Sequence, residues 1–305
     1  MDKLFFITVD TEGDNLWDWH PGEPITTENA NYISRFQNTC EKYGFKPVYL
    51  INYEMAKSQK LNKTLSQSAE LGLCEIGMHL HAWNTPPEYS LKGSFGGLPY
   101  ITEYPKDVIY EKHDYLMKLI YSQFGTMPVS YRAGRWSTNS SLFEVLNDLG
   151  FHIDCSVVPQ VDQRTIPGFT VSKGNDYRNA PAKVVNLIGD LWEVPMTTRF
   201  VRSFGGDSMK HRIKNIIKGK YLWLRPAVQT VEEMKQLIDI VSNEGINFLD
   251  FMVHSSELMP GCSPYCKTEY DIEIMYSKME AVFNYAISQG YCGYTLKQYY
   301  EDYLK

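Results

Sequence analysis

The sequence predicts an α/β protein with a mainly parallel sheet. Five helix-like segments each run into a glycine and then into a short apolar stretch, at Gly44, Gly72, Gly150, Gly245 and Gly290. Glycine readily adopts the left-handed conformation on which many helices end. The apolar stretches, such as FLDFMV, are continuous rather than alternating, which is typical of strands whose two faces are covered by helices. Repeated junctions of this kind indicate alternating helices and strands.

The elements can be assigned in order along the chain. The first strand is LFFITV at residues 4–9, and later strands follow the five glycines. Apolar residues spaced by three and four predict helices, which we expect at Glu28 to Tyr43, Pro105 to Phe124, Asn139 to Leu149, Thr230 to Asn243 and Glu269 to Gln289. Residues 156–225 break this rhythm with four prolines and short β-branched runs. We therefore expect one domain over residues 1–305 that contains an irregular insertion at about 156–225.

Composition excludes several classes of protein. With 305 residues, of which 43% are hydrophobic and 22% charged, the chain can bury a large core. A net charge of −6 and a pI near 5.7 argue against nucleic acid as a partner, because phosphate binding needs clustered basic residues. No apolar run is long enough for stable membrane insertion. The opening residues do not resemble a signal peptide, and the six scattered cysteines suit a reducing compartment, so we expect a cytoplasmic protein.

Acids and histidines follow three of the expected strands. Asp10, Glu12 and Asp14 come after the first strand, His79 and His81 after the third, and His254 after FLDFMV. The carboxyl ends of parallel strands form one face of the fold, where sites are built. The sequence therefore predicts that these side chains converge.

The pair His79 and His81 has two interpretations. Both side chains could be ordinary buried histidines. In an extended segment, however, residues two apart point to the same side, so both imidazoles could reach one ion. Two imidazoles and a carboxylate form a donor set that suits catalytic zinc, and a bound metal activates water for hydrolysis of an amide or ester.

The order VDTEGD, EIGMHLHAWNTPP, YRAGRWSTN, LWEVPMT and FMVHSSELMPG resembles the five motifs of the NodB-like polysaccharide deacetylases, carbohydrate esterase family 4, and within them the WalW-type subgroup. The resemblance spans Phe5 to about Gly261. It implies a deformed (β/α) barrel with about seven parallel strands. It also implies one divalent metal ion, for which we expect Zn²⁺, with Co²⁺, Ni²⁺ and Mn²⁺ as alternatives.

Motif positions imply roles for individual residues. Asp10 matches the general base, His254 the general acid and Arg132 the arginine that pairs with the base. Glu193 in LWEVP stands near the acid that tunes the catalytic histidine.

The metal ligands depart from the usual spacing. The family's metal-binding acid directly follows the base, whereas here Thr11 intervenes, so Glu12 is expected and Asp14 remains an alternative. His79 matches the first histidine. The usual position of the second holds Trp83, and His81 is expected to replace it.

Substrate contacts are expected from five further residues: Trp83, Arg135, Trp136, Phe251 and Val253. The last two would form walls of an acetyl pocket.

The resemblance implies a metal-dependent hydrolase that removes an N-acetyl or similar acyl group from an amino sugar during surface polysaccharide biosynthesis. The candidate substrates are nucleotide-linked or lipid-linked amino sugars. Two alternatives remain open. The unusual ligand spacing allows an inert carbohydrate-binding barrel, because fold does not fix function. A deformylase or metal-free amidohydrolase would keep Asp10 and His254.

Overall fold

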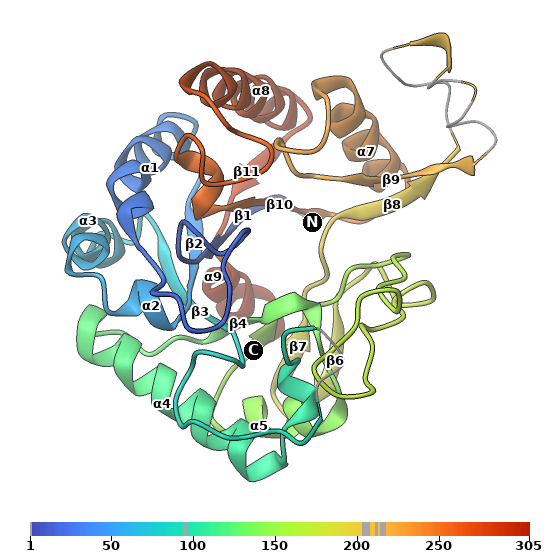
Figure 1. Ribbon diagram of the computed structural model, residues 1–305. Helices are drawn as coiled ribbons and strands as arrows, with labels where there is room; N and C mark the ends of the chain where they lie inside the picture. Colours follow the sequence, from blue (N-terminus) through green and yellow to red (C-terminus); the bar gives the residue numbers. More distant parts are fainter. Residues whose placement is uncertain (1, 94–96, 203–207, 211–212, 214–217) are drawn as a thin grey trace.

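The structure is a computed structural model that describes residues 2–93, 97–202, 208–210, 213 and 218–305 (Figure 1). Within these residues a nine-stranded sheet has the order β10-β1-β2-β3-β4-β5-β7-β6, and β11 also pairs with β1. Its strands are β1 (Lys3–Thr11), β2 (Pro47–Ile51), β3 (Glu75–Leu80), β4 (Ser130–Ala133), β5 (Ile153–Asp154), β6 (Val185–Ile188), β7 (Leu191–Glu193), β10 (Phe248–His254) and β11 (Tyr291–Gly293).

The sheet is mostly parallel and curled. Each neighbouring pair from β10 through β7 runs parallel, while β6 runs antiparallel to β7. The curled sheet forms a half-barrel with helices around its outside (Figure 1). The predicted deformed (β/α) barrel is therefore confirmed.

Helices cover the outer face of the sheet, except that the C-terminal residues Leu296, Tyr299 and Tyr300 pack on its barrel side. They are α1 (Ile33–Lys42), α2 (Tyr53–Ala56), α3 (Gln59–Glu70), α4 (Lys106–Phe124), α5 (Ser140–Asp148), α7 (Val231–Asn243), α8 (Glu269–Ser288) and α9 (Leu296–Tyr299), with short helical turns η1 (Glu28–Tyr32), η2 (Ile101–Glu103), η3 (Gly134–Trp136), η4 (Ser255–Leu258) and η5 (Tyr300–Leu304). Four of the five predicted helices match α4, α5, α7 and α8 to within one residue at each end. The first, expected at Glu28 to Tyr43, begins as the 3-10 turn η1, and the α-helix α1 starts only at Ile33. The five junction glycines have φ between 66° and 84°, which confirms their left-handed conformation. None of the helices in the described residues is long and apolar enough to cross a membrane.

Residues 156–225 are more than a surface insertion. They contribute β7 to the parallel sheet beside β5. They also supply a two-stranded ribbon of β8 (Thr198–Val201) and β9 (Lys220–Trp223).

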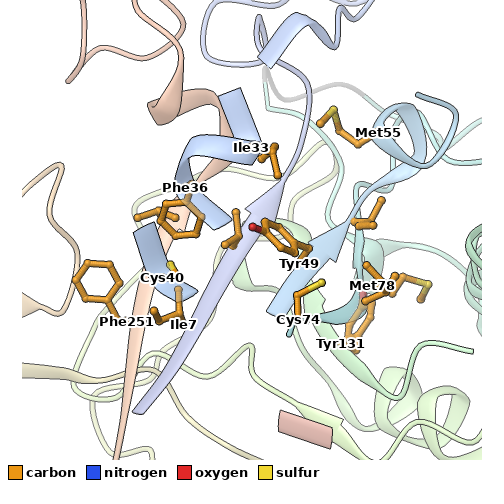
Figure 2. Packing of buried hydrophobic residues seen from close by; sticks show 14 of the residues in the cluster. Ile7, Ile33, Phe36, Cys40, Tyr49, Met55, Cys74, Met78, Tyr131 and Phe251 are labelled. Carbon is orange, nitrogen blue, oxygen red and sulfur yellow. The ribbon is translucent and has the colours of Figure 1, made fainter. Parts of the chain in front are cut away.

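The strands divide their side chains between two sides. In β1, Phe5, Ile7 and Val9 join a large core cluster that also includes residues of α1 and α8, whereas Leu4 and Phe6 pack in a second cluster on the barrel side. Figure 2 shows Ile7 of β1 together with Phe36 and Cys40 of α1 in the first cluster. Since side chains alternate along a strand, Thr8 and Asp10 continue the barrel-side row.

Candidate metal centre

The ends of four strands bring the candidate residues together. Asp10 and His254 are direct partners in the β1–β10 register, and His79 and Arg132 are partners between β3 and β4. Because the strands are parallel, their carboxyl ends lie at one mouth of the half-barrel. This is the convergence that the sequence predicted.

Glu12, His79 and His81 form a compact buried group. Their ligand-capable atoms all lie within 4.8 Å of one another. The two Nε2 atoms are 3.0 Å apart, and Glu12 Oε2 lies 3.3 Å from His81 Nε2 and 3.8 Å from His79 Nε2. These distances allow one small ion to reach all three side chains.

The protonation of the group suits a metal ion. His79 Nδ1 lies 3.0 Å from the carbonyl oxygen of Arg132. Because a carbonyl only accepts, Nδ1 carries the proton and Nε2 presents a lone pair. Burial lowers the pKa of both histidines to about 4, so both imidazoles are neutral near neutral pH. Two neutral imidazoles and one carboxylate are a donor set for a divalent ion such as zinc.

Neighbouring residues hold His81 in place. The indole of Trp83 stacks on its ring, with centroids 4.4 Å apart and planes 19° from parallel. On the side of β4, a Cβ on Gly134 would stand only 2.6 Å from His81 Cδ2. The small residue at this position therefore makes room for the histidine.

Arg132 holds Asp10 from inside the barrel. Its Nη1 donates to Asp10 Oδ1 at 2.7 Å, and its Nη2 donates to Asp250 Oδ2 at 3.0 Å and to Thr8 Oγ1 at 2.9 Å. Burial opposes ionisation of Asp10, but Arg132, His79 and His254 outweigh it and lower the pKa of Asp10 below its ordinary value. Asp10 is therefore a charged carboxylate whose second oxygen, Oδ2, faces His254.

His254 completes the opposite side of the site. Its Nε2 lies 3.7 Å from Asp10 Oδ2 and 3.9 Å from Glu12 Oε1. Its Nδ1 is 3.0 Å from Nη2 of Arg225, and its backbone N–H donates to Glu257 Oε2 at 3.0 Å. Burial and Arg225 lower the pKa of His254, whereas Glu12 and Glu257 raise it, and the net shift is upward.

Arg225 and Glu257 were not predicted from the sequence. Glu257 is only three residues after His254, so the helical turn η4 (Ser255–Leu258) was an available signal. Arg225 follows β9 and lies outside every motif, so no local pattern marked it.

The structure does not place Glu193 against His254. Among the described residues, the polar side chains near His254 are Asp10, Glu12, Arg225 and Glu257. Glu193 instead accepts from the backbone N–H of Val157 at 2.9 Å. The prediction that Glu193 tunes His254 is therefore wrong, and Glu257 occupies that place.

Phe251 and Val253 are not walls of an acyl pocket. Both belong to the core cluster between sheet and helices, and Figure 2 shows Phe251 in this packing. The reason is the alternation of strand side chains. His254 points to the site, so Val253 and, two residues earlier, Phe251 point to the opposite face of β10.

Asp14 lies apart from the candidate ligands. Its carboxylate accepts from the hydroxyl of Thr26 and, at 3.2 Å, from the backbone N–H of Asn29. It is not part of the group that could hold a metal. The structure thus favours Glu12.

A cavity of about 330 Å³ opens on the group, lined by Asp10, Glu12, Leu16, Trp17, His79, His81, Trp83, Leu98, Ala133, Arg135, Trp136, Ile166 and His254. The predicted substrate contacts Trp83, Arg135 and Trp136 thus line it. The Nη2 of Arg135 is engaged within the protein, since it donates to the carbonyl oxygen of Pro167 at 2.8 Å.

An adjoining groove of about 730 Å³ shares Trp83 and Leu98 with this cavity. Its wall carries five aromatic side chains, Trp19, Trp83, Tyr89, Tyr104 and Phe169. None of the described residues that line it is charged.

Comparisons with known proteins agree with the architecture. No protein-family model matches the sequence, and no curated protein matches it. A putative polysaccharide deacetylase from Mycobacterium smegmatis aligns with 99% of this chain and 90% of its own, at 14% identity and a TM-score of 0.55. The chain has the fold of that protein.

Two further solved structures align less closely. The Xyl-CE4 domain of a multidomain xylanase from the hindgut metagenome of Trinervitermes trinervoides aligns with 99% of this chain and 91% of its own, at 9% identity and a TM-score of 0.46. A family 4 carbohydrate esterase from Streptomyces lividans, in complex with acetate, aligns with 95% of this chain and 91% of its own, at 9% identity and a TM-score of 0.46.

Proposed function

We propose that this protein is a metal-dependent hydrolase that removes an N-acetyl or similar acyl group from an amino sugar. One observation carries the proposal. The candidate ligands Glu12, His79 and His81 line the same cavity as Asp10 and His254, so a metal site, a carboxylate and an imidazole face one space. The fold shared with the M. smegmatis protein supports it.

The residues divide the chemistry between them. A divalent ion held by Glu12, His79 and His81 would polarise the acyl oxygen and favour loss of a proton from water. Asp10 would accept that proton on Oδ2, because Oδ1 is bound by Arg132. His254 would act on the departing nitrogen from Nε2, which faces the same space 3.7 Å from Asp10 Oδ2.

The lining of the groove favours a substrate whose bound part is uncharged. Aromatic faces bind sugar rings through their apolar surfaces, and the described lining of the groove is uncharged. Two arginines that could have held a diphosphate are engaged elsewhere: Arg132 binds Asp10 and Asp250, and Arg199 binds Glu244. We propose that the sugar ring and its neighbour occupy the cavity and the groove, and that any phosphate of a carrier lies outside this uncharged lining.

The biological setting is also a proposal. From the motif resemblance we infer a WalW-type deacetylase of surface polysaccharide biosynthesis that meets cytoplasmic intermediates. Nucleotide-linked and lipid-linked N-acetylated amino sugars are the expected carriers, and zinc the expected metal, with cobalt, nickel and manganese as alternatives.

The test is release of acetate from a panel of acceptors by the zinc-loaded protein. The panel contains nucleotide-linked and lipid-linked N-acetylamino sugars, short neutral oligomers and an N-formyl analogue. We expect amine formation that requires metal and is lost on chelation. Binding of these sugars without any hydrolysis would instead support an inert carbohydrate-binding barrel.

A further inference from the structure

Arg225 reaches His254 because β9 continues alongside β10. The Leu224 N–H donates to the carbonyl oxygen of Thr197 at 3.2 Å, and the Leu224 carbonyl accepts from Met252 N–H at 3.0 Å. The next turn is held by Lys278, whose Nζ donates to the carbonyl oxygens of Pro226 and Gln229 at 3.2 Å each. Hydrogen bonds on both sides of Arg225 thus hold its backbone beside the end of β10, where His254 lies.

The guanidinium of Arg225 is also enclosed. It lies 5.3 Å from the ring centre of Tyr265 and 5.9 Å from that of Trp17, within the range of cation–π contacts. It forms an ion pair with the fully buried carboxylate of Glu257. Trp17 is itself tied down, because its indole N–H donates to Ser256 Oγ at 3.0 Å.

The hydrogen bond between Arg225 and His254 has only one possible direction. A guanidinium only donates hydrogen bonds and stays protonated in proteins. At 3.0 Å from Arg225 Nη2, Nδ1 of His254 must therefore be the acceptor. Glu257 Oε1, the competing acceptor for a proton on Nδ1, is farther away at 3.7 Å. The ring proton of neutral His254 then sits on Nε2 and faces Asp10.

We propose that Arg225 is a positioning residue that keeps the ring proton of His254 on Nε2, so that His254 donates a hydrogen bond to the reacting group while Asp10 performs both proton transfers. This inference rests on the proposed function. Asp10 takes a proton from water as the water oxygen bonds to the acyl carbon. It returns that proton to nitrogen when the C–N bond breaks and its electron pair leaves with the nitrogen. The products are a carboxylic acid and an amine.

Placement of the proton can be tested without substrate. The zinc-loaded protein, labelled with ¹⁵N-histidine, is studied by NMR in mildly alkaline buffer, and the His254 signals are assigned by their loss in His254→Gln. We expect shifts of an Nε2-protonated ring in the wild type and movement toward the Nδ1-protonated form in Arg225→Met. A wild-type ring protonated on Nδ1, or on both nitrogens, would overturn the inference.

Kinetics test the role in turnover. Arg225→Met should lower kcat about 10-fold or more with KM nearly unchanged, and Arg225→Lys should restore part of the loss. Removing a donor to a developing charge costs roughly 10²- to 10³-fold in kcat, and Arg225 acts on such a donor, His254, only indirectly. Metal content should not change. The matched control is Arg35→Met, which also removes an arginine paired with a carboxylate, Glu273, and stacked on an aromatic ring, Tyr276, but far from the site.

His254 variants separate the two roles. A glutamine keeps an N–H donor but cannot transfer a proton, so His254→Gln should retain clearly more turnover than His254→Ala. Equal loss in both would show that His254 transfers the proton itself and would overturn the proposal. If the wild type hydrolyses no acylated sugar, the proposed function fails, and the ¹⁵N shifts still decide where the proton sits.

Discussion

The Nε2 atoms of His79 and His81 lie 3.0 Å apart inside the protein. Since His79 donates from Nδ1 to the carbonyl oxygen of Arg132, its Nε2 can only accept. Two such nitrogen lone pairs next to a carboxylate are stabilised when a cation lies between them and binds all three side chains.

We therefore expect one divalent ion per chain, bound by Glu12, His79 and His81. Replacing either histidine with alanine should lower zinc affinity by more than the roughly 10- to 100-fold that is typical for loss of a residue that merely supports a ligand. Metal analysis and titration calorimetry measure this. Full occupancy in the His79→Ala, His81→Ala double variant would refute the site.

The choice between Glu12 and Asp14 gives a matched pair of variants. Glu12→Gln removes a carboxylate that lies 3.3 Å from His81 Nε2 and should weaken zinc binding about 10-fold or more. Asp14→Asn changes a carboxylate that binds Thr26 and Asn29 and should leave affinity unchanged. The reverse result would make Asp14 the ligand.

Asp10→Asn should separate chemistry from metal binding. Loss of a general base lowers kcat by roughly 10²- to 10⁴-fold, whereas the ligands Glu12, His79 and His81 remain in place. We expect zinc content equal to that of the wild type. A variant that loses its zinc would identify Asp10 as a ligand.

Gly134→Ala should weaken the metal site without touching a ligand. The new Cβ would stand 2.5 Å from the Leu80 carbonyl oxygen and 2.6 Å from His81 Cδ2, so His81 must shift. Zinc affinity should fall about 10-fold, as for loss of other supporting contacts. Gly293→Ala is the control, because its Cβ would meet Phe45 Cα at 2.7 Å on β11, away from the site. It should lower the melting temperature but not zinc affinity.

His113 should make the fold sensitive to acid. Burial, aided by Lys112, lowers its pKa to about 4, although the carbonyl of Ile109 opposes the shift. A lowered pKa means that its stabilising contribution is present above the ordinary pKa of 6.5 and is lost as pH falls from there through about 4. Between 6.5 and about 4, the loss amounts to about 3–4 kcal/mol at 1.4 kcal/mol per pKa unit.

Urea denaturation at several pH values measures this effect. His113→Gln should remove part of the acid dependence of the unfolding free energy, while a substitution of the exposed His20 should not. Parallel pH curves for His113→Gln and the wild type would contradict the assignment.

Much of the site could be predicted because strand ends converge. The acids after β1, the histidines after β3 and His254 at the end of β10 follow apolar strands, and parallel pairing brings such ends to one face. Most helix boundaries could also be predicted, because glycines and the spacing of apolar residues are local signals.

The missed residues have physical explanations. Phe251 and Val253 were assigned to a pocket by motif position, although strand alternation places them opposite His254. Arg225 depends on the pairing of Leu224 with Met252, a contact between distant segments. Local patterns do not specify such contacts.

The central place of β1 has a consequence for biosynthesis. Its pairing with β10 begins at Leu4, which lies opposite Phe248. The ribosome therefore makes β1 long before β10, the strand that pairs with this edge of β1. At 5–20 residues per second, the interval is roughly 10–50 s. During that time an apolar strand with one unpaired edge is open to other chains. A nascent chain of this protein should therefore need shielding by chaperones until β10 has left the ribosome, and premature termination before residue 248 should yield aggregates.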